Sequence, residues 1–231
     1  MIPIRDTIPS RRWPVVNCAI IALCAWALWR EIAAGPEVDV LLEHYALTPA
    51  TFVRSLARHG WLEAGQWTPF VTSMFLHGGL GHFAGNMIFL WIFGDNVEDR
   101  LGHVGYALFY LAGGIAAAAV HVMSAPGSTV PTLGASGAIA AVMGAYMLLY
   151  PSSQVETLVI VFVFVRIVSV PAVVWLGLWF LFQVLSGTAD TRGAGEGGVA
   201  WFAHIGGFAF GAAVVLLLGL RGAPRPVRSS W

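Results

Sequence analysis

One feature of the sequence limits what this chain can fold into: residues 101–155 contain no Asp, Glu, Lys or Arg. A helix that crosses the hydrocarbon of a membrane needs roughly 20 mostly apolar residues, so this run is long enough for two. The run does not alternate as the strands of a membrane barrel do, which leaves helices. Pro, Gly and Ser in residues 124–131 interrupt it. We therefore predict one helix near residues 106–123 and another near 134–150.

The composition indicates the same class of protein. Hydrophobic residues make up 58% of the 231 residues, and charged residues only 10%, whereas soluble domains carry roughly 25% charged residues. Twelve basic and twelve acidic side chains give no net charge, so there is no basic field to bind nucleic acid. The chain is predicted to be a membrane protein that binds no nucleic acid.

Four more apolar runs complete the predicted membrane domain. Together the six runs predict an all-α, polytopic bundle of six transmembrane helices over residues 15–220, between an N-terminal segment, 1–14, and a C-terminal tail, 221–231. The four further spans lie near residues 13–29, 81–94, 172–186 and 200–220.

Two apolar segments need separate interpretation. Residues 155–168 are rich in β-branched side chains, but they are too few for a span and include Arg166, so we expect an interfacial or re-entrant segment. The first run follows basic residues, as a signal peptide would. Its length and its end at Trp29, Arg30 and Glu31 favour an uncleaved anchor.

The arginines predict the orientation. With six spans, eight of the twelve arginines lie on the side of the two termini and four on the other. Because basic residues accumulate on the cytoplasmic side, we expect both termini in the cytoplasm and the protein in the bacterial plasma membrane.

Four polar side chains inside the predicted spans are candidates for function, because polar groups in lipid are costly. His82 and Asn86 share one face of the second helix, Ser136 begins the fourth, and His204 lies in the first turns of the sixth. These three helices all start on the same side of the membrane. The four residues should therefore lie at similar depth.

Small residues beside these polar groups predict close helix packing. Ser136, Ala140 and Gly144 recur every four residues, and His204 is followed by Gly207 and Gly211 in a GxxxG pattern. Such stripes let helix backbones approach each other. Ser136 and His204 can then reach the hydrogen-bonding distance of about 2.6–3.2 Å that nucleophilic catalysis requires.

The chemistry of these groups suggests their roles. A serine hydroxyl needs a base to accept its proton, and His204 is the candidate on a facing helix, so we predict a Ser136–His204 dyad. Backbone N–H of Ser136, the Asn86 amide and His82 are candidate donors to the oxyanion. No carboxylate fits as a third member. His77 is a candidate for shaping the site, whereas packing roles are expected for His103 and His121.

A metal site is not expected. The spacing of His77 and His82 lacks a Glu and does not match an HExxH motif, so no metal and no cofactor are predicted.

These motifs resemble the rhomboid family of intramembrane serine proteases. The matching pieces are Gly134-Ala-Ser-Gly around Ser136, Phe75-Leu-His-Gly-Gly before His82-x-x-x-Asn86, Ala203-His-x-x-Gly-x-x-x-Gly, and the segment from Gly94 to Gly102. In this chain Ala140 stands where some members carry an aromatic residue that supports the histidine. Trp67-Thr68 stands where many carry Trp-Arg.

The resemblance implies a protease that cleaves transmembrane protein substrates in or near their membrane segments, in contact with membrane lipids and without a cofactor. Ser136 would be the nucleophile, His204 the general base and acid, and His82 and Asn86 the oxyanion donors. Residues 34–68 would lie partly in the membrane, and the fifth helix with the glycine-rich loop 187–200 would form a gate and cap.

Two other classes of protein remain as alternatives. A catalytically silent rhomboid-like protein that binds or routes membrane clients would keep the fold, but the presence of both dyad residues favours the enzyme. A transporter or channel would be expected to carry charged groups in mid-membrane or repeated halves, and neither is evident in the sequence.

Overall fold

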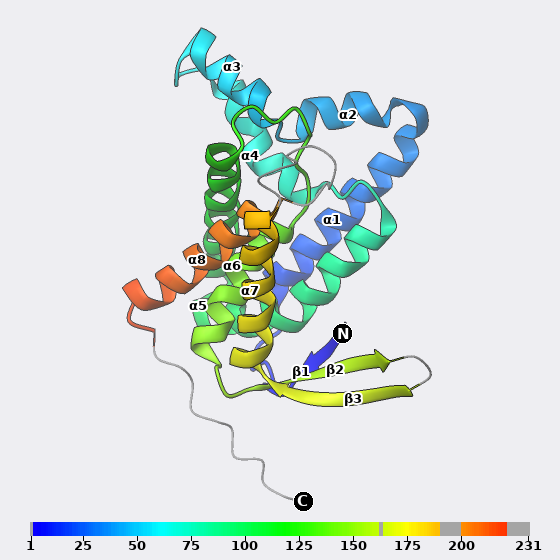
Figure 1. Cartoon of the computed structure of the whole chain (residues 1–231), viewed down its shortest axis with the longest axis vertical. Coiled ribbons are helices and arrows are strands. Elements are labelled where there is room, and N and C mark those ends of the chain that lie inside the picture. The colour runs from blue at the N-terminus through cyan, green and yellow to red at the C-terminus, as the bar shows by residue number, and fades with distance from the viewer. Residues whose placement is uncertain (1, 162–163, 190–199, 221–231) are drawn as a thin grey trace, which may run out of the picture.

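The computed structural model describes residues 2–161, 164–189 and 200–220. Its helices form a bundle with a small sheet across one end and short helices at the other (Figure 1). The elements in chain order are β1 (Ile2–Asp6), α1 (Val15–Ala34), η1 (Gly35–Glu37), α2 (Val38–Tyr45), α3 (Pro49–His59), η2 (Ala64–Trp67), α4 (Thr68–Thr72), η3 (Ser73–Phe75), α5 (Leu80–Ser124), α6 (Ser136–Leu149), β2 (Gln154–Val161), β3 (Phe164–Pro171), α7 (Ala172–Ala189) and α8 (Trp201–Leu217).

The helical stretches have the length and apolarity of a membrane bundle. Val15–Tyr45, Leu80–Ser124 and Ala172–Ala189 are long and apolar enough to cross a membrane, while α6 and α8 are shorter apolar helices. The backbone of α5 turns sharply at Gly102, where φ is 72°, so α5 consists of two helical segments. The fold is therefore mainly helical, as the sequence predicts.

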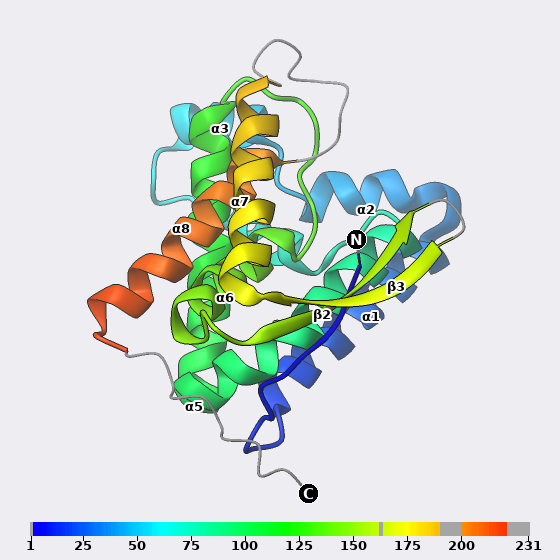
Figure 2. The same ribbon diagram turned by 60° about the horizontal axis from the view of Figure 1, so that its bottom comes forward.

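The prediction of an all-α fold is wrong in one respect, because the chain contains a three-stranded antiparallel sheet in the order β1-β2-β3. Residues 155–161 of β2 and 164–168 of β3 pair as a hairpin, in which Leu158 faces Ile167, where the sequence predicts an interfacial or re-entrant segment. β-Branched residues favour strands. The hairpin lies across the ends of the helices, and β1 from the predicted N-terminal segment pairs with β2 (Figure 2).

The second predicted span is also longer than expected. Helix α5 continues past Gly94 through the charged segment to its turn at Gly102, and His103 lies in the helical segment that follows. Glu98, in this charged segment, is buried and has partners there. Its carboxylate accepts the backbone N–H groups of Val16 and Asn17 at 2.9 and 2.8 Å, in the first turn of α1. A carboxylate at a helix N-terminus satisfies N–H groups that have no partner within the helix.

Helix α6 forms the centre of the bundle. Every residue from Gly137 to Tyr146 is buried, and α6 packs mainly against α8 and α5. A helix that is apolar on all sides is stable only when other helices surround it. This packing holds the N-terminal end of α6 in place. Ser136 lies at that end, which is the end away from the sheet.

The close approach of α6 and α8 depends on Gly207 and Gly211. A Cβ atom at Gly211 would lie 1.9 Å from the carbonyl oxygen of Ala141, and one at Gly207 would lie 2.1 Å from that of Gly137. Backbone atoms cannot move aside as a flexible side chain can. The predicted small-residue interface is therefore present.

We expect Gly211→Ala to cost about 3 kcal/mol, near the upper end for overpacking, and to separate Ser136 from His204. The matched control is Gly177→Ala in α7, because a Cβ there meets nothing within 4 Å. Thermal melting in detergent measures the difference between the two variants. Equal melting temperatures would contradict this explanation of the helix contact.

Candidate active site

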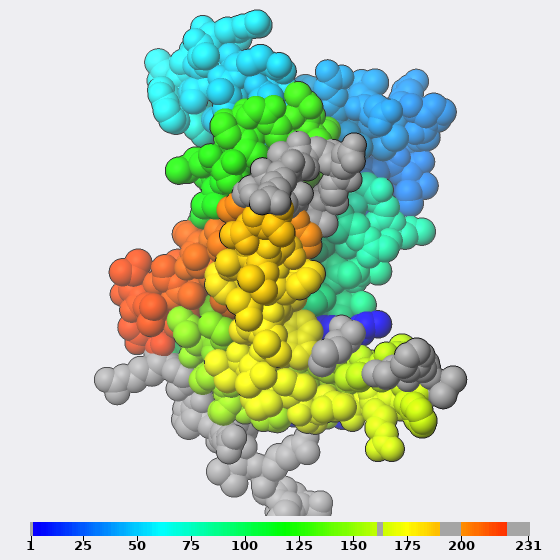
Figure 3. Space-filling model, in the orientation of Figure 1, coloured from blue at the N-terminus to red at the C-terminus, as the bar shows by residue number. Residues whose placement is uncertain are grey.

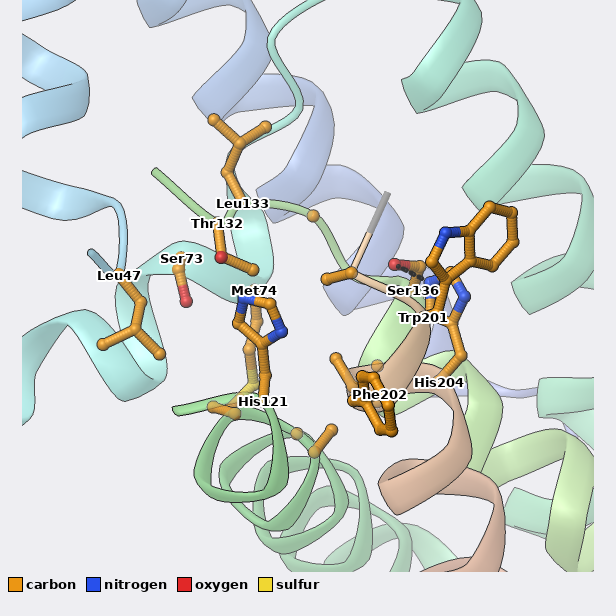
Figure 4. A pocket seen from close by; sticks show the side chains of 18 of the residues that line it. Leu47, Ser73, Met74, His121, Thr132, Leu133, Ser136, Trp201, Phe202 and His204 are labelled. Carbon is orange, nitrogen blue, oxygen red and sulfur yellow. Dashed lines mark hydrogen bonds between the residues drawn. The ribbon is translucent and has the colours of Figure 1, made fainter. Parts of the chain in front are cut away.

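The structure brings Ser136 and His204 into direct contact. Ser136 is the first residue of α6, His204 lies in the first turn of α8, and Nε2 of His204 is 2.8 Å from Oγ of Ser136 (Figure 4). Both residues lie at the ends of their helices away from the sheet. The geometry suits transfer of the hydroxyl proton to the imidazole.

The second nitrogen of His204 contacts a residue that the sequence analysis did not single out. Nδ1 of His204 lies 2.7 Å from Oε1 of Gln183, which is buried in α7. The rings of Trp179 and Trp201 also lie beside the His204 ring, at centroid distances of 5.8 and 6.4 Å. One signal for Gln183 was available, because it is the only amide side chain in the predicted span 172–186.

His82 and Asn86 lie beside the loop that leads into Ser136. Gly134 has a φ of 121°, a conformation that L side chains rarely adopt, and its N–H donates to the carbonyl of Ser73 at 2.8 Å. A Cβ atom at Gly134 would lie 2.6 Å from Cε1 of His82 and 3.6 Å from Nδ2 of Asn86. A glycine is therefore required where this loop passes the two side chains.

Asn86 offers a free hydrogen-bond donor. Its Nδ2 atom is buried, lines the same cavity as Ser136, and has no hydrogen-bond partner among the described residues. A buried donor without a partner is costly unless a ligand or water completes it. The first-turn N–H groups of α6 likewise have no partner within the helix.

His82 is held by the chain that precedes it. Its Nδ1–H donates to the carbonyl of His77 at 2.8 Å. With that proton committed, His82 presents an N–H at Nε2 only when the ring is an imidazolium.

His77 lies beside His82 and does not line the cavity that contains Ser136. It is buried, and its ring packs against those of His82 and Phe83. Burial, together with a smaller effect of the neighbouring His82, lowers the pKa of His77 to about 4. His77 is therefore neutral at physiological pH.

Glu31 anchors this segment, and sequence reasoning did not assign it. Its buried carboxylate accepts the backbone N–H of His77 at 2.9 Å and that of Gly78 at 2.7 Å. A carboxylate that accepts two N–H groups holds a loop more firmly than a neutral acceptor. The contact crosses 46 residues of chain, so local sequence patterns could not reveal it.

We expect Glu31→Gln to lower the free energy of unfolding by about 1–3 kcal/mol, because the amide presents an N–H where an acceptor is needed. Loosening the segment before His82 should also reduce activity. Glu43→Gln, at an exposed position in α2, is the matched control. Melting curves that are the same for both variants would refute the anchoring role.

The four predicted residues line one cavity of about 950 Å³. Pockets that bind small molecules have volumes of roughly 300–1,000 Å³, so this cavity is a large one. His121, for which a packing role was expected, points into the same cavity from α5 (Figure 4). The cavity can hold more than the reacting bond alone.

The remaining predictions concern a metal site, residues 34–68, the glycine-rich loop and the C-terminal tail. No group of three or more His, Cys, Asp or Glu that could hold a metal occurs within the described part of the chain. Residues 34–68 form η1, α2, α3 and η2, at the end of the bundle away from the sheet (Figure 1). Of the predicted glycine-rich loop 187–200, residues 187–189 belong to the end of α7, and residues 190–199 lie outside the described residues, as does the tail 221–231.

The fold and the site together define a multi-helix membrane protein with a Ser–His pair in an internal cavity. The model of the Rhomboid domain matches residues 64–221, and the chain therefore belongs to the rhomboid family. Rhomboids are integral membrane proteins, in agreement with the apolar helices.

Curated relatives share parts of this chain. It is 41% identical over 73 residues to Rhomboid-like protein 11, chloroplastic, of Arabidopsis thaliana, which covers 32% of this chain and 26% of that protein. It is 36% identical over 86 residues to Rhomboid protease GluP of Bacillus subtilis, covering 37% and 16%. Presenilin-associated rhomboid-like protein A, mitochondrial, of Danio rerio is 27% identical over 143 residues, covering 61% and 32%. The chain thus spans less than a third of the length of each relative.

Proposed function

We propose that this protein is an intramembrane serine protease that hydrolyses peptide bonds in or near the transmembrane segments of other membrane proteins. The observation that carries the proposal is the hydrogen bond of 2.8 Å between Ser136 Oγ and His204 Nε2, at the wall of a large cavity. Membership of a family that includes Rhomboid protease GluP supports it.

The reaction follows from these positions. His204 Nε2 takes the proton of Ser136 as Oγ attacks the carbonyl carbon of the substrate, which gives a tetrahedral oxyanion. The proton then passes from His204 to the leaving amine, and an acyl-enzyme remains. Water, deprotonated by His204, releases the acid and regenerates Ser136.

Donors for the oxyanion surround Ser136. Asn86 Nδ2 is free to donate, the backbone N–H of Ser136 has no partner within α6, and the N-terminal end of α6 adds a partial positive charge. His82 contributes in its imidazolium form, because its Nδ1–H is bound to His77.

We also propose six transmembrane spans, formed by α1, the two segments of α5, α6, α7 and α8, with both termini in the cytoplasm of a bacterium. The sheet then lies at the cytoplasmic ends of the helices and the dyad near the opposite side. Substrates are membrane segments that unwind readily, with Gly, Pro or polar residues and a small residue at the cut. A peptide bond within an intact helix is shielded from attack.

The test is to label the purified protein in detergent with a fluorophosphonate probe, which reacts with activated serines. We expect one adduct, identified by mass spectrometry on the peptide that carries Ser136, together with cleavage of a transmembrane substrate. A folded protein that neither labels nor cleaves would instead support the catalytically silent client-binding protein.

A further inference from the structure

Helix α7 is mostly apolar but contains one buried amide, Gln183. Its neighbours Leu181, Phe182 and Leu185 are exposed at the surface of the bundle, whereas Gln183 is only 4% exposed. Figure 3 shows α7 on the outside of the bundle, next to α8. Gln183 therefore faces the interior of the bundle, whereas these three neighbours face outward.

The contact of Gln183 assigns the two nitrogens of His204. Oε1 of Gln183 has no hydrogen and can only accept, so the atom 2.7 Å away, His204 Nδ1, must carry the proton. In a neutral imidazole this leaves Nε2 with its lone pair. That lone pair is what Ser136 Oγ–H needs at 2.8 Å.

The other residues near His204 do not provide this contact. Ala140, one turn after Ser136 in α6, has no group that could support the ring. Trp179 and Trp201 flank the ring through their own rings and supply no acceptor for Nδ1. Gln183 is the acceptor for Nδ1 among the described residues.

We propose that Gln183 is the third member of the site, a positioning residue that fixes the tautomer and orientation of His204. It also stabilises the imidazolium that forms when Ser136 loses its proton, because the amide oxygen accepts from a charged donor more strongly than from a neutral one. The inference rests on the proposed protease activity.

The first test measures the rate of fluorophosphonate labelling against pH in Gln183→Leu and Gln183→Glu, beside the wild type. Leu keeps the bulk and removes the acceptor, so labelling should slow by about 10-fold to 100-fold, as for loss of one buried hydrogen bond. The KM for a transmembrane substrate should not change. Leu108→Ala, at an exposed position in α5, should label at the wild-type rate.

The conservative variant provides the rescue. A carboxylate at position 183 accepts from Nδ1–H and favours the imidazolium more strongly than the amide does. Gln183→Glu should therefore keep labelling at its optimum and shift the acid limb of the pH profile to higher pH. A role in packing alone would leave the pH profile of Gln183→Glu unchanged.

The second test does not depend on activity. ¹⁵N NMR of histidine-labelled protein, with the His204 signals assigned by their absence in His204→Asn, reports which nitrogen holds the proton. We expect Nδ1–H in the wild type and its loss in Gln183→Leu. An Nε2–H tautomer in the wild type, or wild-type labelling by Gln183→Leu, would overturn the proposal.

The two readouts separate this inference from the proposed function. If the wild type does not label, the protease assignment fails, while the tautomer measurement still decides whether Gln183 holds His204. If Gln183→Leu does not fold, the wild-type tautomer and the pH profile of Gln183→Glu decide the matter.

Discussion

Replacing Ser136 by Ala is expected to abolish labelling and cleavage, a loss of about 10⁴-fold or more, while the protein stays folded. The change removes the only oxygen that touches His204 Nε2, at 2.8 Å, among the described residues. It adds no volume to the tightly packed start of α6. The measurement is the turnover of a transmembrane substrate together with fluorophosphonate labelling.

Two further variants make this result specific. His204→Ala should reduce turnover to a similar level, because residues that act as a unit are not additive. Ser128→Ala alters another hydroxyl that lines the cavity and should leave the rate unchanged. Turnover that persists in purified Ser136→Ala would show that another group is the nucleophile.

Replacing Asn86 by Ala is expected to lower kcat by about 10²–10³-fold, the range for one oxyanion donor, with little change in KM. Asn86 Nδ2 is buried without a partner, so the resting protein loses no hydrogen bond when it is removed. The cost should appear only when the oxyanion forms. Steady-state kinetics of cleavage separates kcat from KM.

Asn96→Ala is the control on the same helix. Asn96 Nδ2 donates to Asp6 and Asp95 at the sheet end of α5, so its removal should lower the melting temperature and leave kcat unaffected. An unchanged kcat in Asn86→Ala would remove this residue from the oxyanion site.

Several contacts that shape the site could not be read from the sequence, because they join distant residues. Glu31 was part of the expected end of the first helix, yet its carboxylate holds the segment before His82. Gln183 stands out as the only amide in the predicted span 172–186, but the local sequence does not show that its partner is His204, 21 residues away. The geometry of these two contacts depends on how the helices pack.

The strand pairing shows the same limit. Residues 155–168 are too few for a helical span, and their β-branched composition fits an interfacial segment as well as strands. The structure pairs β2 with β3 and also with β1, which lies about 150 residues earlier: Ile2 faces Leu158. Hydrogen-bond partners so far apart leave no periodic signal in either strand.

Hydrophobic length and local spacing are properties of short segments, so the apolar helices, the membrane class and the motifs around Ser136 and His204 can be read from the sequence. The contact of His204 Nε2 with Ser136, the contact of Gln183 with the other nitrogen, and the sheet at one end of the bundle appear only once the chain is folded. Those arrangements depend on distances between helices. Such distances are set by close packing at positions such as Gly207 and Gly211, where a single added carbon would collide with the backbone of α6.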